Sequence, residues 1–181
     1  MKRIFLSLAI IAMTTMAFAQ QQAGKTKEKE VSNAEKFSER AGSLIQKEFV
    51  DIASLKKCNI QVAKFTDLIS GQNYSAVRFE YEYKSSISSD TKVALLDEDE
   101  IDGLIKSIKI IQEKILPTTA TNYTEVNFMS RSGFIAGCFS RKEKWTTFMK
   151  LEKFDSNSYV FMDKEDLTTL LTLLQQAKAK L

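Results

Sequence analysis

Apolar positions recur with helical spacing in two stretches of the chain that align without a gap, 66 residues apart. In each stretch three apolar residues precede an aspartate, an acidic residue follows three positions later, and a helical apolar stripe comes next. The buried-face positions align as Ile101 with Leu167, Leu104 with Leu170, Ile105 with Leu171 and Ile108 with Leu174. A match at a fixed period usually marks a duplicated structural unit. We therefore predict two units that each end in a strand and an amphipathic helix, the first helix running to Leu116.

The acidic residues at the start of each predicted helix are best explained as helix caps. Asp97 and Asp163 occupy the N-cap position, where a carboxylate accepts hydrogen bonds from first-turn amides. Glu100 and Asp166 occupy the third helical position, as in a capping box. The alternative is a calcium-binding loop, which needs a glycine at its sixth position. The stretch that begins at Asp97 lacks that glycine, so the pattern favours caps.

Alternation with a period of two predicts strands ahead of the first helix. The clearest strand is Val77–Lys84, in which apolar or aromatic residues alternate with charged ones. Cys58–Phe65 alternates as well, and Lys92–Leu96 leads into the helix. Nearer the N terminus, Ser32–Glu35 has the composition of a capping box and predicts a short helix. We expect its inner face to hold Phe37, Ala41, Leu44 and Ile45, and the chain to pass near Gly42 into a strand at 44–52.

The second half repeats this order after Pro117, which ends the first helix. Strands are predicted at Tyr123–Ser130, Phe134–Ser140, Trp145–Phe154 and Tyr159–Met162, followed by the last helix. The predicted fold class is therefore α+β, with two tandem β-β-β-β-α repeats at about 44–116 and 123–181. We expect the antiparallel sheets to pack with the two helices around a pseudo-twofold axis, in a single globular domain at 34–181.

The first residues have the pattern of a secretory signal peptide. A basic start at Lys2 and Arg3 precedes an apolar run, and Ala17-Phe18-Ala19 forms a cleavage site before Gln20. The run is too short for a permanent membrane span. We expect residues 1–19 to be removed and the mature protein to be exported, periplasmic or extracellular, with no transmembrane anchor. The polar residues 20–33 predict a flexible tail.

Charge and cysteine content bound the possible partners and cross-links. The formal net charge is +3, and removal of Lys2 and Arg3 leaves +1. This value argues against a general nucleic-acid or anionic-membrane binder, which needs a concentrated positive field. Cys58 and Cys138 are a candidate disulfide, which could stabilise the fold by about 4–5 kcal/mol in the chain-entropy model. Two separate buried thiols are the equal alternative, because sequence does not show whether the cysteines are close in space.

The order of elements resembles a known architecture. A tandem of four strands plus one helix is similar to the Whirly, Pur-alpha and PC4-type folds that bind single-stranded nucleic acid, over roughly residues 44–181. The resemblance lies in the order of elements rather than in motifs. It implies sheets that pack through their helices and hold single strands on basic and aromatic faces. The best-defined outward face here is mixed in charge, with Arg78, Glu80, Glu82 and Lys84.

A second resemblance concerns two short stretches. Ala17–Gln20 and Phe65–Gly71 are similar to segments of small secreted proteins of Bacteroidetes-type bacteria. This resemblance implies no particular activity.

The residues that usually carry catalysis are scarce. The chain has no histidine, which excludes Ser-His-Asp and Cys-His arrangements, and its six glycines form no phosphate-binding loop. We therefore expect no catalytic residues, no metal and no cofactor. Paired carboxylates could in principle hydrolyse glycosides. The candidates for such a pair are Glu80, Glu82, Asp97 and Asp99.

One surface has the composition of a binding site. Trp145 follows the basic turn that contains Arg141, Lys142 and Lys144, where an exposed indole could stack on a sugar or a base. The alternative is a Trp145 that packs in the core.

These observations together favour an exported, non-enzymatic binding or interaction module. Its partner would be a protein, a cell-envelope component, or a second copy of itself that pairs through a sheet edge. The alternatives are a single-stranded nucleic-acid-binding protein, by analogy of fold, and a carboxylate-based hydrolase.

Overall fold

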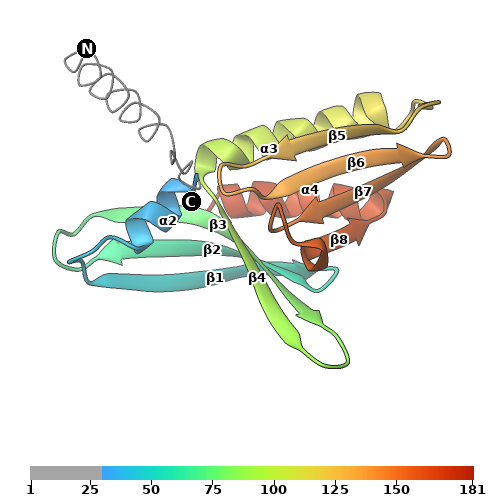
Figure 1. Cartoon of the computed structure of the whole chain (residues 1–181). Helices are drawn as coiled ribbons and strands as arrows, with labels where there is room; N and C mark the ends of the chain where they lie inside the picture. Colours follow the sequence, from blue (N-terminus) through green and yellow to red (C-terminus); the bar gives the residue numbers. More distant parts are fainter. Residues whose placement is uncertain (1–29) are drawn as a thin grey trace, which may run out of the picture.

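The computed structural model describes residues 30–181, in which a short helix precedes two four-stranded antiparallel sheets, each followed by a helix (Figure 1). The first sheet has the order β1-β2-β3-β4 and the second the order β5-β6-β7-β8. The α+β class and the two tandem β-β-β-β-α units are thus confirmed. The predicted signal peptide at 1–19 and most of the predicted tail at 20–33 lie outside the described residues.

The bounds of the elements follow the predicted order closely. In the first unit they are α2 (Asn33–Ser38), β1 (Ile45–Leu55), β2 (Cys58–Asp67), β3 (Asn73–Lys84), β4 (Ser89–Leu96), α3 (Glu98–Ile110) and the π-helical turn η1 (Ile111–Ile115). In the second unit they are β5 (Thr124–Met129), β6 (Ile135–Arg141), β7 (Lys144–Lys150), the 3-10 turn η2 (Ser156–Ser158), β8 (Tyr159–Met162) and α4 (Lys164–Lys178).

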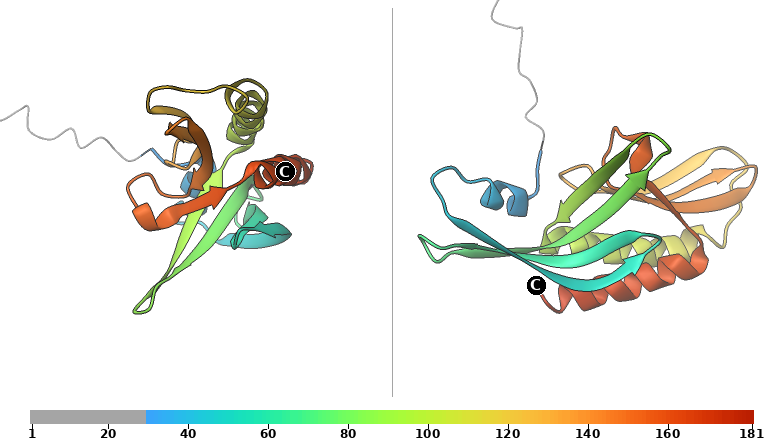
Figure 2. Two further views of the ribbon diagram at one scale, coloured as in Figure 1. Left: turned by 90° about the vertical axis from the view of Figure 1, so that its right-hand side faces the viewer. Right: turned by 90° about the horizontal axis from the view of Figure 1, so that it is seen from below.

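The apolar stripes of α3 and α4 form the centre of the core, as the duplicated pattern predicted. Ile101, Leu104, Leu167 and Leu170 are almost completely buried. The two helices pack against each other, and Figure 2 shows them side by side. Each helix also contacts strands of both sheets, and α4 lies along β1 and β2 of the first sheet. The two units therefore share one hydrophobic core rather than closing separately.

The short helix α2 differs from its prediction in length and position. It ends at Ser38, four residues before Gly42, which takes a left-handed φ of +77°. Of the predicted inner face only Phe37 is buried, whereas Leu44 is 59% exposed. The helix packs on the outer face of the first sheet, where Phe37 and Ala34 cover Ala63, Phe65 and Ala76. As a result, β2 is buried on both faces around Val62, Ala63 and Phe65, whereas Asn59 on its outer face is exposed.

A second difference lies at the end of β7, which stops at Lys150 rather than continuing to Phe154. The Leu151 amide donates to the Ser158 carbonyl, and the Ser158 hydroxyl bonds the backbone of Glu152 and Asp155. These bonds close a loop at 151–158, and Phe154 lies 92% exposed on it. In residues 30–181 no helix has the length and apolar character needed to cross a membrane.

Candidate functional site

The outer face of the second sheet carries a continuous row of five aromatic side chains, which we call the aromatic face. Its members, in spatial order from β5 to β8, are Tyr123, Phe139, Phe148, Tyr159 and Phe161. Consecutive ring centroids are 6.3, 6.0, 5.2 and 5.5 Å apart, the range in which aromatic pairs interact. The row runs from Tyr123, just before β5, across β6 and β7 to β8, because outward positions of neighbouring strands lie side by side in the register.

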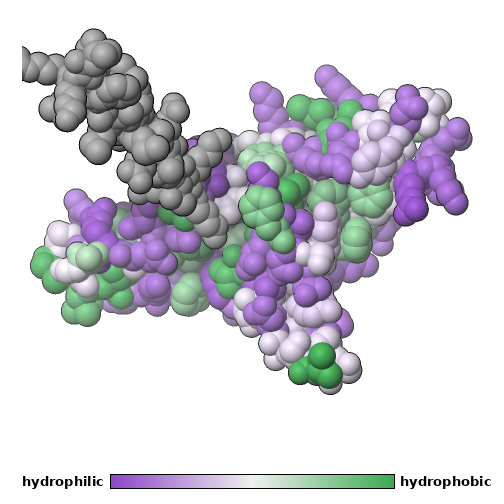
Figure 3. Space-filling model, viewed as in Figure 1, coloured by the Kyte–Doolittle hydropathy of each residue, from purple (hydrophilic) through white to green (hydrophobic). Residues whose placement is uncertain are grey.

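This surface is open, unlike its counterpart in the first unit. The outer face of the first sheet is partly covered by α2, whereas no described element covers the second. The outer face of the second sheet is turned toward the viewer in Figure 1, and Figure 3, in the same view, shows hydrophobic and hydrophilic residues mixed over it. Tyr123 is 65% exposed and Phe161 is 56% exposed, while Phe148 is buried beneath its neighbours. One buried ring, Phe148, therefore lies between the partly exposed rings of Phe139 and Tyr159.

The aromatic face surrounds a hollow of about 310 Å³. Besides the five rings, Glu125, Asn127 and Ile135 line it. Gly137 lies in β6 between Asn127 and Phe148. A methyl group on Gly137 would collide with the Val126 carbonyl oxygen and the Asn127 side chain, so only glycine fits there. The missing side chain lets Asn127 lie close against the sheet.

Charges are distributed unevenly around the hollow. Among the described residues Glu125 is the one charged residue in its lining, and its carboxylate accepts a hydrogen bond from the Tyr123 hydroxyl. That bond raises the pKa of Tyr123, because it favours the protonated phenol beside a carboxylate. At the other margin the Lys150 ammonium lies 4.6 Å from the centroid of the Tyr159 ring and donates to the Lys153 carbonyl at 2.8 Å.

The residues of the predicted surface around Trp145 lie on opposite sides of the second sheet. Trp145 packs partly against the core, and its Nε1 donates to the Thr118 carbonyl at 2.7 Å. It thus lies on the inner side of β7, as the core-packed alternative proposed. Arg141, Lys142 and Lys144 are exposed, and Lys142 occupies the turn between β6 and β7. By the alternation of the strands, Arg141 and Lys144 are on the same side as the aromatic face.

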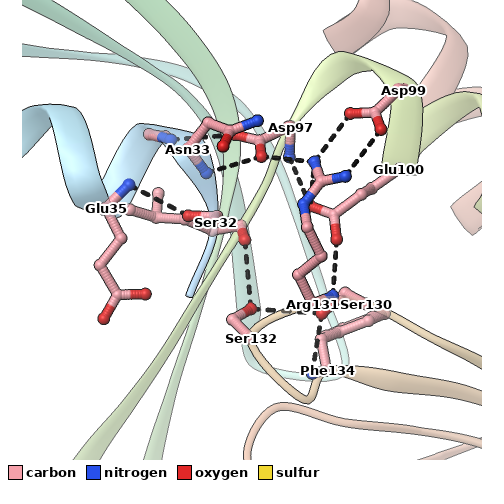
Figure 4. A network of polar contacts seen from close by, with 12 residues as sticks. Ser32, Asn33, Glu35, Asp97, Asp99, Glu100, Ser130, Arg131, Ser132 and Phe134 are labelled. Atoms are coloured by element: carbon pink, nitrogen blue, oxygen red, sulfur yellow. Dashed lines mark hydrogen bonds and ion pairs between the residues drawn. The ribbon is translucent and has the colours of Figure 1, made fainter. Parts of the chain in front are cut away.

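The predicted cap Asp97 has a further role in addition to its place in the capping box of α3 (Figure 4). Glu100 accepts from the Asp97 amide at 3.0 Å, as expected for a capping box. The Asp97 carboxylate, however, is completely buried and accepts from the amides of Asn33 and Ala34 at 2.8 and 3.0 Å. A side chain at the start of α3 therefore also holds the first turn of α2.

Arg131, in the turn between β5 and β6, connects the second unit to the same group. Its guanidinium binds Asp99 with two bonds of 2.8 Å and Asp97 with one of 2.5 Å, and its backbone amide donates to Glu100 at 2.7 Å. The guanidinium lowers the pKa of the Asp99 carboxyl. We call this group of Asp97, Asp99, Glu100 and Arg131 the acidic clasp. It joins α2, α3 and the second sheet.

The other predicted acidic residues are also engaged in ion pairs. Asp163 and Asp166 form a capping box on α4, and the Lys56 ammonium lies 2.9 Å from Asp166. Glu80 pairs with Arg78 and Glu82 with Lys84. Within the described residues, no group of three Cys, Asp or Glu side chains is placed to hold a metal ion.

The candidate disulfide is not present. Cys58 lies in β2 and Cys138 in β6, and both are free, buried thiols in the shared core. Burial raises the pKa of Cys58 to about 12 and that of Cys138 to about 11, because the apolar surroundings disfavour the thiolate. The alternative of two separate thiols is therefore correct. Each cysteine belongs to a different sheet and packs there as a small apolar residue.

A larger groove of about 1410 Å³ lies between α2, the outer face of the first sheet and two loops of the second unit. Its lining contains exposed apolar groups, among them Phe49, Met129 and Phe154. Acidic and basic side chains both line it, among them Glu35, Glu39, Lys47 and Lys153. This mixture indicates no preference for one charge of ligand, so the aromatic face is the better-defined candidate.

Sequence reasoning missed the aromatic face, although a signal for it exists. In β6 and β8 apolar residues occupy outward as well as inward positions, as in Phe139 beside Cys138 and Phe161 between Val160 and Met162. An antiparallel strand with one face in water normally alternates. Loss of the alternation therefore indicates a second apolar surface.

No known protein family, curated protein or solved structure matches the chain.

Proposed function

We propose that this protein is a non-enzymatic binding module that holds another molecule, a protein or a cell-envelope component, on the aromatic face. The observation that carries this proposal is the unbroken row of five aromatic rings on an uncovered sheet. Large apolar side chains left in contiguous contact with water mark interaction sites in soluble proteins. Tyrosine in particular is enriched among the residues that contribute most to binding.

The arrangement of the rings supports a role as a binding surface rather than as aromatic side chains that are merely exposed. Phe148 is 4% exposed and contacts Phe139 and Tyr159, so these two rings lose little conformational freedom when a ligand arrives. Tyr159 and Phe161 are stacked with an interplanar angle of 4°. Polar groups on Glu125 and Asn127 border the apolar area. An apolar centre with a polar margin is the usual anatomy of a binding surface.

The test compares binding to a cell-envelope preparation by cosedimentation. Tyr123→Ala and Phe161→Ala each remove an exposed ring and should reduce the bound fraction at least tenfold when combined, in line with the loss expected at energetically important contacts. Phe154→Ala is the matched control, because Phe154 is even more exposed than Tyr123 and Phe161 but lies on the loop outside the aromatic face. Equal binding by all variants would contradict the proposal.

A single-stranded nucleic acid is the second candidate ligand. Lys150 over the Tyr159 ring, with Arg141 and Lys144 on the same side, supplies positive charge beside stacking surfaces. Proteins that hold single strands combine these two features. Filter binding to a mixed-sequence oligonucleotide separates the candidates. Binding that weakens steeply with salt and is lost in Lys150→Gln would favour nucleic acid.

Export is part of the same proposal and rests on residues 1–19 alone. The basic start, short apolar run and Ala17-Phe18-Ala19 site indicate cleavage before Gln20. Expression of the full chain in a secretion-competent bacterium, followed by intact-mass measurement, should give a mature protein that begins at Gln20. Replacement of Ala19 by a bulky residue should leave the precursor uncleaved.

A further inference from the structure

The lining of the hollow in the aromatic face favours a positively charged group over a negatively charged one. Five rings and one carboxylate, that of Glu125, surround it together with two uncharged side chains, and no basic side chain from residues 30–181 lines it. The faces of aromatic rings carry partial negative charge and attract cations, most strongly where water is displaced. Rings and carboxylate therefore act in the same direction. An anionic group in the hollow would meet Glu125, whereas a cationic group would meet only favourable charges in the lining.

We propose that the hollow binds an alkylammonium group of the ligand, held by cation–π contacts with the aromatic rings and by the Glu125 carboxylate. This inference rests on the proposed function, since it names the chemical class that the same surface recognises. An alkylammonium group combines a positive charge with apolar carbon, so it suits a lining that is mostly aromatic. An inorganic cation would instead require several oxygen ligands, and in the part of the chain that the structure describes Glu125 is the one carboxylate that lines the hollow.

The protein's own lysine shows the same interaction at the margin of this surface. The Lys150 ammonium lies 4.6 Å from the centroid of Tyr159, within the distance at which a ring attracts a cation. Its position is fixed by the bond to the Lys153 carbonyl. On the side of the row nearest β5, no cation of residues 30–181 lies over the Tyr123 or Phe139 ring, and Arg141 is close enough to act on the pKa of Tyr123 without stacking on it. That part of the hollow is therefore available to a ligand.

The neighbouring charges limit what the ligand can be. Arg141 and Lys144 lie at the end of the strands and Lys150 at the opposite margin, so the hollow suits one positive charge rather than a polycation. Glu125 is partly engaged, since it accepts from Tyr123 and from the Asn127 amide at 3.2 Å. These bonds hold the carboxylate at the edge of the rings, where it can attract a bound cation electrostatically without a direct hydrogen bond to it.

The experiment compares two small molecules of the same shape by calorimetry and by shifts in the NMR signals of the aromatic rings. Choline carries the positive charge, and dimethylbutanol is its uncharged carbon isostere. We expect choline to bind about five- to thirtyfold more tightly, the range of a cation–π contact. Glu125→Gln should weaken choline and leave dimethylbutanol unchanged, and Phe139→Leu should weaken choline more than the isostere. A lysine amide tested beside choline distinguishes a protein side chain from a quaternary head group.

Control variants and the pattern of outcomes keep the two proposals separate. Glu82→Gln removes an exposed strand carboxylate outside the hollow and should change neither affinity. Equal binding of choline and dimethylbutanol would overturn the ammonium inference and leave an apolar site. If neither molecule binds while Tyr123→Ala and Phe161→Ala still abolish binding to the envelope preparation, the inference fails and the proposed function stands. If those variants also have no effect, both fail.

Discussion

At the scale of single residues, the Asp97 side chain joins three parts of the molecule. Its buried carboxylate accepts from two amides of α2 and from the Arg131 guanidinium. Asp97→Asn keeps the shape but removes the charge, which leaves Arg131 and the α2 amides with weaker partners. We expect a loss of about 2–4 kcal/mol in the free energy of unfolding, measured by urea denaturation.

Asp102→Asn is the matched control for this measurement. Asp102 pairs with Lys178 across α3 and α4, but its side chain is 52% exposed. Exposed ion pairs contribute about 0.5 kcal/mol or less to stability, so this variant should unfold almost as the wild type does. Equal effects of the two substitutions would contradict the structural role assigned to the acidic clasp.

The two cysteines give a second prediction about single residues. Because burial raises the pKa of Cys58 to about 12 and of Cys138 to about 11, neither forms a thiolate at pH 8 in the folded protein. A thiol reagent at pH 8 should therefore label neither cysteine until denaturant is added, and then label both without any reductant. Labelling that requires a reductant would reveal a disulfide and contradict the structure.

At the scale of elements, the hairpins depend on backbone conformations that their sequences do not favour. The turn from β6 to β7 places Lys142 at φ +51° and Glu143 at φ +63°, and Lys56 and Lys57 are in the same region between β1 and β2. A left-handed conformation costs about 1–2 kcal/mol for a residue other than glycine. The double change Lys142→Asn and Glu143→Gly suits such a turn. We expect the double substitution to raise the free energy of unfolding by about 0.5–1 kcal/mol, measured by thermal unfolding. By contrast, Asn59→Gly lies within strand β2 and should lower the free energy of unfolding.

The helix α2 has only six residues, so its stability comes from packing rather than from its own hydrogen bonds. Phe37 is 6% exposed and stacks with Tyr74 at a centroid distance of 6.1 Å. Phe37→Ala should release α2 locally, with at least tenfold faster amide hydrogen exchange at residues 33–38 and little change in β5 to β8. Phe154→Ala should leave exchange unchanged throughout. Faster exchange across both sheets would show that α2 is needed for the whole core.

The elements themselves were predictable because their signals are local. The spacing of Ile101, Leu104 and Ile108 predicts a helix with one buried side from neighbouring residues alone. The alternation from Val77 to Lys84 predicts a half-buried strand in the same way. The short helix was misjudged because Leu44 is apolar but exposed, and no local pattern shows that. The end of β7 was misjudged for a related reason, since the bonds of Ser158 that close the loop join residues six positions apart.

At the scale of the whole molecule, the contacts that create the candidate site are those that local patterns do not contain. The aromatic face depends on the register of four strands, which brings Phe139 beside Phe148 and Phe148 beside Tyr159. Asp97 was correctly placed at the start of a helix, but its contact with Asn33 spans 64 positions in sequence. Sequence therefore identified the repeated units and left open which outer sheet face is covered.

The shared core leads to a prediction about the independence of the two units. Helix α4 packs on β1 and β2, and Phe79 of the first sheet contacts Phe134 of the second unit at a centroid distance of 4.9 Å. Fragments 30–118 and 119–181 should each lack a cooperative thermal transition, because each exposes half of a common core. The full chain should unfold in one transition. Leu170→Ala, at a fully buried position of α4, should lower stability by about 2–5 kcal/mol and speed exchange in β1 and β2 as well as in the second sheet. Cooperative folding of fragment 30–118 alone would contradict a shared core and would make the first unit a separate domain.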